Sequence, residues 1–108
     1  MRNQVNLIGH LGNDPEIHEF DKGRKLAKFS LATNEVYTNN EGEKITQTQW
    51  HRVVFFGGAS EIVEKYLRKG KEVAVSGKIT YREYEDKDGV KRRTAEIVGS
   101  DLVLLGSK

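Results

Sequence analysis

The chain has 108 residues, a length that accommodates one domain with a single hydrophobic core. Its composition of 36% hydrophobic and 31% charged residues, with 11 Gly and 1 Pro, is typical of a turn-rich domain with a modest core. The lack of Cys excludes disulfides, thiolate metal sites and thiol nucleophiles. A net charge of +2 neither requires nor excludes a nucleic-acid ligand, so the positions of the cations matter more than their sum.

No long apolar run or signal-peptide pattern occurs in the sequence. We therefore expect a cytoplasmic protein that makes no contact with membranes.

The first third of the chain predicts two strands. Apolar and polar residues alternate over residues 4–11, and the Gly-Asn-Asp-Pro sequence at 12–15 indicates a turn. Residues 16–20 fit as a continuation of the first strand beyond that kink. A second strand is predicted over residues 25–37, with Ala27, Phe29 and Leu31 facing the core.

The stretch from Thr46 to Gly57 predicts a third strand, because β-branched and aromatic residues dominate it and Gly57-Gly58 ends it. Successive side chains of a strand point to opposite faces. One face then carries Trp50, Arg52, Val54 and Phe56, and the other carries Gln49, His51, Val53 and Phe55.

The strand pattern alone allows two interpretations of the face that carries Trp50. Aromatic rings with a cation between them suit stacked bases and the phosphates that join them, and each stacked base is worth roughly 1–3 kcal/mol. Trp50 and Phe56 could equally be core residues, since most aromatic side chains are buried. Arg52 favours the first reading and Val54 the second.

After Gly58 the spacing of apolar residues changes to that of an amphipathic helix of about three turns. Ser60 is the expected N-cap, and Gly70 the expected C-terminal stop after Arg68 and Lys69.

Strand patterns then resume over residues 73–84 and 90–98, joined by a hairpin signal at residues 86–89. Gly99-Ser100 is expected to break the return arm and to leave 101–105 as a last short strand. The predicted fold is therefore all-β with one short helix: a five-stranded barrel of the oligonucleotide/oligosaccharide-binding (OB-fold) type, with a long β-hairpin extension.

No catalytic or metal-binding pattern is present in the sequence. The three His residues lack ligand spacing, and no Ser or carboxylate has the setting of a nucleophile or of an acid–base pair. We expect a protein that is not an enzyme and that needs no cofactor or metal.

Several blocks of sequence, in order, resemble the bacterial single-stranded DNA-binding protein (SSB) family. They cover residues 6–16, 29–34, 48–57, 64–70 and 73–79. The resemblance implies the five-stranded barrel over residues 1–105, with 106–108 as a C-terminal remnant, and a homotetrameric assembly. It also implies that single-stranded DNA wraps over the outside of the barrel.

The resemblance assigns roles to particular residues. The stacking aromatics are expected at Trp50, Phe56, Tyr37 and Tyr84, of which the last two are often Trp in the family. The phosphate contacts are expected at Arg52, Arg82, Lys69, Arg2, Lys91, Arg92 and Arg93, although the last three, on the return arm of the hairpin, could also be solvated charges without a ligand. His51 points away from the Trp50 face and is expected at a subunit contact.

The family normally continues into a flexible linker and an acidic tip that recruits replication and repair proteins. This sequence stops at Lys108, through either removal of the tail or a short natural form. Such partners are therefore expected only if the full-length protein has the acidic tail.

The sequence thus predicts a nucleoid-associated protein that binds single-stranded DNA without sequence preference, in replication, recombination and repair. A primosome-type or RNA-directed OB-fold protein is one alternative. A protein-interaction module that merely shares the barrel is another.

Overall fold

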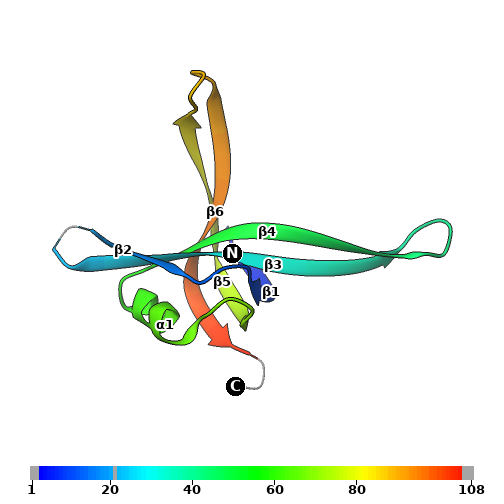
Figure 1. Ribbon diagram of the computed structural model, residues 1–108, viewed down its shortest axis with the longest axis horizontal. Coiled ribbons are helices and arrows are strands. Elements are labelled where there is room, and N and C mark those ends of the chain that lie inside the picture. The colour runs from blue at the N-terminus through cyan, green and yellow to red at the C-terminus, as the bar shows by residue number, and fades with distance from the viewer. Residues whose placement is uncertain (1–2, 21, 106–108) are drawn as a thin grey trace.

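A computed structural model describes residues 3–20 and 22–105 of the chain. It contains six strands and one helix in these ranges (Figure 1). The strands are β1 (Val5–Leu11), β2 (Glu16–Phe20), β3 (Arg24–Thr38), β4 (Lys44–Phe56), β5 (Glu72–Glu85) and β6 (Lys91–Leu104), and the helix is α1 (Gly58–Tyr66). Within the described residues no helix has the length and apolar character needed to cross a membrane.

Five of the strands close into a barrel. Their hydrogen-bonded order is β1-β5-β6-β4-β3, and β1 returns to pair with β3 at His10–Ala32 and Leu11–Leu31. All of these pairings are antiparallel except the short parallel contact between β4 and β6. The all-β fold with one helix and a closed five-stranded barrel is confirmed, and β2 is an additional strand.

Strand β2 lies in line with β1 along the same edge of β3. The pairing shifts by two residues between Leu11–Leu31 and Glu16–Lys28, across the Gly12–Pro15 turn. Asn13 anchors this turn, since its Oδ1 accepts a hydrogen bond of 2.9 Å from the Ser30 N–H. Residues 16–20 thus continue the path of β1, but as a separate strand.

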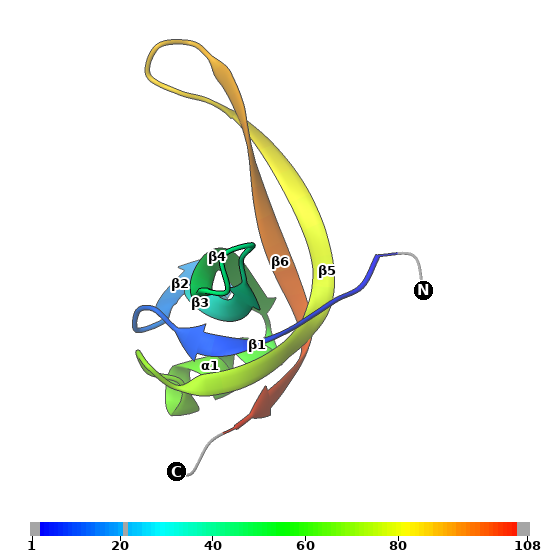
Figure 2. The same cartoon turned by 90° about the vertical axis from the view of Figure 1, so that its right-hand side faces the viewer.

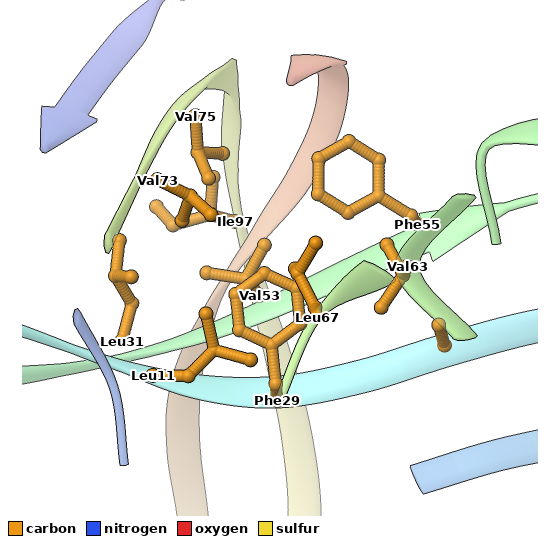
Figure 3. Packing of buried hydrophobic residues seen from close by; sticks show 11 residues of the cluster. Leu11, Phe29, Leu31, Val53, Phe55, Val63, Leu67, Val73, Val75 and Ile97 are labelled. Carbon is orange, nitrogen blue, oxygen red and sulfur yellow. The ribbon is translucent and has the colours of Figure 1, made fainter. Parts of the chain in front are cut away.

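Inward-facing residues of the barrel strands and of α1 form the core (Figure 3). Phe29 and Phe55 stack within it, with ring centroids 6.2 Å apart, and Val63 of α1 and Leu67 just after the helix belong to the same cluster. The cluster consists of Leu11, Ala27, Phe29, Leu31, Val53, Phe55, Val63, Leu67, Val73, Val75 and Ile97. The members on β3, β4 and β5 are at the inward positions that strand alternation predicts.

The ends of α1 differ from the prediction. Gly57, with a φ of 68°, is the N-cap residue, while Ser60 lies in the first turn and donates its hydroxyl to the Gly57 carbonyl at 2.6 Å. The helix ends at Tyr66 because Leu67 turns extended and is fully buried in the core. Gly70 therefore lies in the following turn and does not end the helix.

The predicted break at Gly99-Ser100 is also wrong, because β6 runs through it to Leu104 as one strand. The pairing of β6 with β5 shifts at this point, so Ser100 is an extra residue in a β-bulge. Gly99 is required there, because a Cβ atom at this position would collide with the Phe55 ring.

Two long hairpins leave the barrel in different directions (Figures 1 and 2). The β3–β4 arm comprises residues 34–48, and the β5–β6 arm comprises residues 81–95. The turn of the β5–β6 arm has the predicted form, with Gly89 at a φ of 78° and its N–H donated to the Asp86 carbonyl. The arms extend the two strand pairs past the barrel and so extend their side-chain alternation as well.

Candidate nucleic-acid interface

Strand β4 carries Trp50, Arg52 and Phe56 on the outside of the barrel. Trp50 is 64% exposed and Phe56 is 50% exposed, whereas Val53 and Phe55 between them are fully buried. Val53 and Phe55 point into the core, so the even positions lie on the outside of the barrel, although Val54 among them is only 4% exposed. The interpretation of Trp50 and Phe56 as core residues is therefore wrong.

The Trp50 ring lies against the backbone of Gly12. A Cβ atom on Gly12 would collide with the six-membered part of the ring. This contact supports one side of the indole while most of the side chain remains exposed. The ring is thus held in place with a free surface toward solvent.

Neighbouring strands extend the surface around Trp50, because side chains of paired residues lie on the same side of a sheet. Lys28 is paired with Val54, and Ser30 is paired with Arg52. On the other side Val54 is paired with Val98, two residues from Glu96. We call this surface the outer face. It comprises Lys28 and Ser30 of β3, Trp50, Arg52, Val54 and Phe56 of β4, Glu96 and Val98 of β6, and Arg82 and Tyr84 of β5.

Three cations and two carboxylates line a hollow between β4 and the β5–β6 arm. The hollow is lined by Lys28, Arg52, Arg82, Glu83, Tyr84, Thr94 and Glu96. Arg82 Nη1 lies 3.4 Å from Glu96 Oε2 and so neutralises the nearly buried Glu96 carboxylate. In the part of the chain that the structure describes, Lys28 and Arg52 have no carboxylate within ion-pair distance. Both are available to an anionic ligand.

The two faces of the β5–β6 arm differ in the residues they carry. Tyr84 is paired with Arg92 and Arg82 with Thr94, and all four continue the outer face. Arg93 and Lys91 lie on the reverse face, where the Arg93 guanidinium stacks 4.8 Å from the centroid of the Tyr81 ring. Of the three cations predicted on this return arm, only Arg92 therefore shares a face with Tyr84.

Arg92 also shapes the tip of the arm. Its Nε donates to Asp86 Oδ2 at 2.7 Å, and Asp86 Oδ1 accepts from the N–H groups of Val90 and Asp88 at 2.9 and 3.0 Å. The hydrogen bond from Arg92, followed by that from Val90, lowers the pKa of Asp86 from its ordinary value of 3.8.

Tyr37 lies on the β3–β4 arm, on the face opposite to Trp50. It is paired with Ile45, five positions along β3 from the Ala32–Trp50 pair, and an odd number of positions reverses the face. Tyr37 is 51% exposed, and Glu35 shares its face. The structure therefore separates Tyr37 from the other predicted aromatics.

The remaining predicted residues lie away from the outer face. Lys69 is in the turn after α1, where its N–H donates to Asp14 Oδ1 at 2.9 Å. His51 is half-buried on the inward face of β4, and its Nε2 is hydrogen-bonded to Thr33 Oγ1 at 3.0 Å. Arg2 lies outside the described residues.

Lys28 was missed by the sequence analysis, although a signal for it was present. It alternates with Ala27 and Phe29, which predicts an outward position on the second strand. Its place beside Arg52 depends on the register between β3 and β4, which the sequence pattern does not define.

No group of three or more His, Cys, Asp or Glu side chains among the described residues is arranged to hold a metal ion.

The barrel, its exposed aromatics and the intervening cations can be compared with known proteins. A model of the "Single-strand binding protein family" matches residues 2–105. The chain belongs to this family.

Relatives named single-stranded DNA-binding protein align with nearly the whole chain. The protein of Xanthomonas campestris is 42% identical over 106 residues, which are 98% of this chain and 62% of that protein. Single-stranded DNA-binding protein 1 of Chlorobaculum tepidum is 42% identical over 107 residues, 98% of this chain and 66% of its own length. The chain thus spans a little less than two thirds of these relatives.

Solved structures of the family have the same fold. The structure described as "Plasmodium falciparum SSB complex with ssDNA" superposes with a TM-score of 0.92 at 36% identity, and the match covers 98% of this chain and 97% of that one. A deletion mutant of the Thermus aquaticus single-stranded DNA binding protein gives a TM-score of 0.84 at 28% identity, covering 98% of this chain and 51% of that one. The closed barrel described above is therefore that of the SSB structures.

Proposed function

We propose that this protein binds single-stranded DNA without sequence preference on its outer face. The observation that carries the proposal is the exposure of Trp50 and Phe56 on either side of Arg52, beside a second unpaired cation, Lys28. Family membership supports it, since the relatives above are named for this activity and one related structure is a complex with single-stranded DNA.

The chemistry of the outer face suits a single strand better than a duplex. Bases of a single strand can leave their neighbours and stack on Trp50 and Phe56, whereas the bases of a duplex are enclosed by pairing. Stacking is tolerant of sequence because every base has a π-face. Lys28, Arg52 and Arg82 then neutralise phosphates, so the affinity falls as salt rises.

In this proposal the residues divide into those on the outer face and those elsewhere on the molecule. Trp50, Phe56 and Tyr84 stack bases, and Lys28, Arg52, Arg82 and Arg92 contact phosphates of a strand that lies on the outer face. Tyr37, Lys69, Lys91 and Arg93 contact DNA only where the strand leaves this face and passes around an arm or the end of the barrel.

We further infer a non-enzymatic role in protecting DNA strands during replication, recombination and repair, at the nucleoid. The assembly we propose is a homotetramer, with His51 near a subunit contact. Replication and repair proteins are proposed as partners of a full-length form that carries an acidic tail.

A fluorescence titration tests the proposal directly, because Trp50 is the only tryptophan. Oligo-dT should quench Trp50 strongly at low salt and more weakly at high salt, while duplex DNA of equal length should leave it unchanged. RNA of equal sequence is the third ligand, since a protein directed to RNA would prefer the strand with a 2′-OH. No quenching, together with no binding in a gel shift, would overturn the proposal.

A further inference from the structure

Strand β2 extends the outer face on the side away from the β5–β6 arm. His18 is paired with Leu26, which is paired in turn with Phe56, so these three side chains lie in one row. Phe20 is two residues further along β2 and points to the same side as His18. Phe20 is 40% exposed and is paired with the exposed Arg24.

The Phe20–Arg24 pair combines an aromatic ring and a guanidinium on an outward strand face, as Phe56 and Arg52 do four residues apart on β4. The barrel does not need Phe20 in its core, because the inward side of these strands is filled by Ile17 and Ala27. Phe20 is therefore exposed because the β2–β3 pairing places it on the outward side, and the core is complete without it.

The distance between Phe56 and Phe20 suits one continuous ligand. Phe20 lies two strands across and two residues along from Phe56, which corresponds to about 12 Å between their Cα atoms. A few nucleotides of an extended strand cover this distance. Lys28 lies on the strand between β2 and β4, on the same side, and its partner on β2 is Glu16, whose Oε1 lies 3.4 Å from His18 Nε2.

We propose that Phe20 and Arg24 form a further subsite for the same single strand, one stacked base on Phe20 and one phosphate on Arg24. This inference rests on the proposed function and lengthens its binding path beyond Phe56 onto β2. Ligands that reach both Trp50 and Phe20 gain a contact that shorter ligands lack.

The test is the affinity for oligo-dT of increasing length, measured by anisotropy of a labelled oligonucleotide at constant salt. Phe20→Leu keeps an apolar side chain but removes the π-face. This variant should bind short oligonucleotides with the affinity of wild type. Its affinity for the longest oligonucleotides should fall by about five-fold or more, because five-fold corresponds to the lower end of the free energy of one stacked base. Phe20→Trp should restore or raise the affinity.

Tyr66→Leu is the matched control. Tyr66 is 54% exposed and also has a cation near its ring, with Lys65 Nζ 5.9 Å from the centroid, but it lies on α1 and not on the strands of the outer face. We expect this variant to bind oligonucleotides of all lengths as wild type does. A loss equal to that of Phe20→Leu would overturn the subsite.

A second measurement detects fluorescence quenching at position 20 directly, so it does not require that Phe20→Leu is as stable as wild type. In the double variant Trp50→Phe/Phe20→Trp, the only tryptophan is at position 20, and long oligo-dT should quench it. Arg24→Gln should reduce the slope of log affinity against log salt by about 0.7, the value for one phosphate contact with a single strand.

The outcomes separate this inference from the proposed function. If oligo-dT quenches Trp50 in the wild type but leaves the tryptophan at position 20 unquenched, DNA binding stands and the subsite fails. If Trp50 itself is not quenched and no binding is detected, both fail.

Discussion

At the scale of residues, the position of the Trp50 ring depends on Gly12, which lies in the turn between β1 and β2. Gly12 lacks the Cβ that would occupy the space of the indole, so the ring can lie close to the backbone there. Stacking platforms bind well when they are held in place before the ligand arrives, because less side-chain entropy is lost. Gly12 is therefore part of the proposed interface although it presents no functional group.

Gly12→Ala tests this role. Because the Cβ meets the far end of an exposed side chain, we expect Trp50 to swing away and the protein to remain folded. The emission maximum of Trp50 should shift, and the affinity for oligo-dT should fall by at most the roughly 1–3 kcal/mol of one stacked base. Gly58→Ala is the control, since its Cβ would meet no described atom within 4 Å. An unchanged spectrum and affinity in Gly12→Ala would contradict the role.

Tyr84 is an aromatic residue of the outer face at a position that is often Trp in the family. The Tyr ring is smaller than the Trp ring. A larger ring offers more stacking surface, so Tyr84→Trp should bind oligo-dT more tightly, by up to about five-fold. The measurement is a salt-matched titration against wild type. Tyr81→Trp, on the reverse face of the same arm, should have no such effect. Equal affinities of Tyr84→Trp and wild type would refute the idea that Tyr84 limits binding.

At the scale of elements, the two arms differ in charge where they leave the barrel. The outer face of the β5–β6 arm carries Arg82 and Arg92 beside Tyr84. The β3–β4 arm carries Glu35 beside Tyr37, and its tip contains Glu41 and Glu43. Carboxylates repel phosphates, so the β5–β6 arm is the better of the two for a nucleic-acid strand.

The tip of the β5–β6 arm should respond to acid. Asp86 has a lowered pKa in the folded arm, so its ionised form stabilises the tip above pH 3.8. That contribution is lost as the pH falls below 3.8 and through the lowered pKa, because the protonated carboxyl no longer attracts Arg92.

Amide exchange measured by NMR can detect this transition. The protection of the Asp88 and Val90 N–H groups, which is the slowing of their exchange relative to an unstructured chain at the same pH, should fall in this acid range. Asp86→Asn should abolish the pH dependence, whereas Asp88→Asn, in the same turn, should preserve it. Persistence of the transition in Asp86→Asn would assign it to another group.

At the scale of the whole molecule, His51 provides a test of the proposed homotetramer. His51 lies on the inward face of β4, half-buried and hydrogen-bonded to Thr33, at the point where the β3–β4 arm leaves the barrel. If a neighbouring subunit packs there, His51→Ala should lower the mass measured by light scattering. Gln49→Ala is the control on the same face of β4. An unchanged mass in His51→Ala would remove His51 from the interface.

The folded molecule also decides which predicted residues can act together. Arg52 and Arg82 are 30 positions apart in the sequence, and they line one hollow because β4 and β5 lie on either side of β6. The separation of Tyr37 from Trp50 could have been predicted, since Tyr37 has the same parity as the core residue Leu31 on an uninterrupted strand. The same reasoning applies to Lys91 and Arg93 once the Asp86–Gly89 turn defines the register of the hairpin.

The sequence by itself determined the type of each element and the parity of its side chains, because backbone alternation and turn chemistry are local properties. It therefore placed Trp50, Arg52 and Phe56 on one face and Val53 and Phe55 on the other. Only the tertiary structure decided which of these faces was buried, since burial depends on which sheet surface closes around the core. Closure likewise decided that β6 continues through a bulge and that Lys28, Arg52 and Arg82 meet in one hollow, because contacts between distant strands depend on register and barrel geometry.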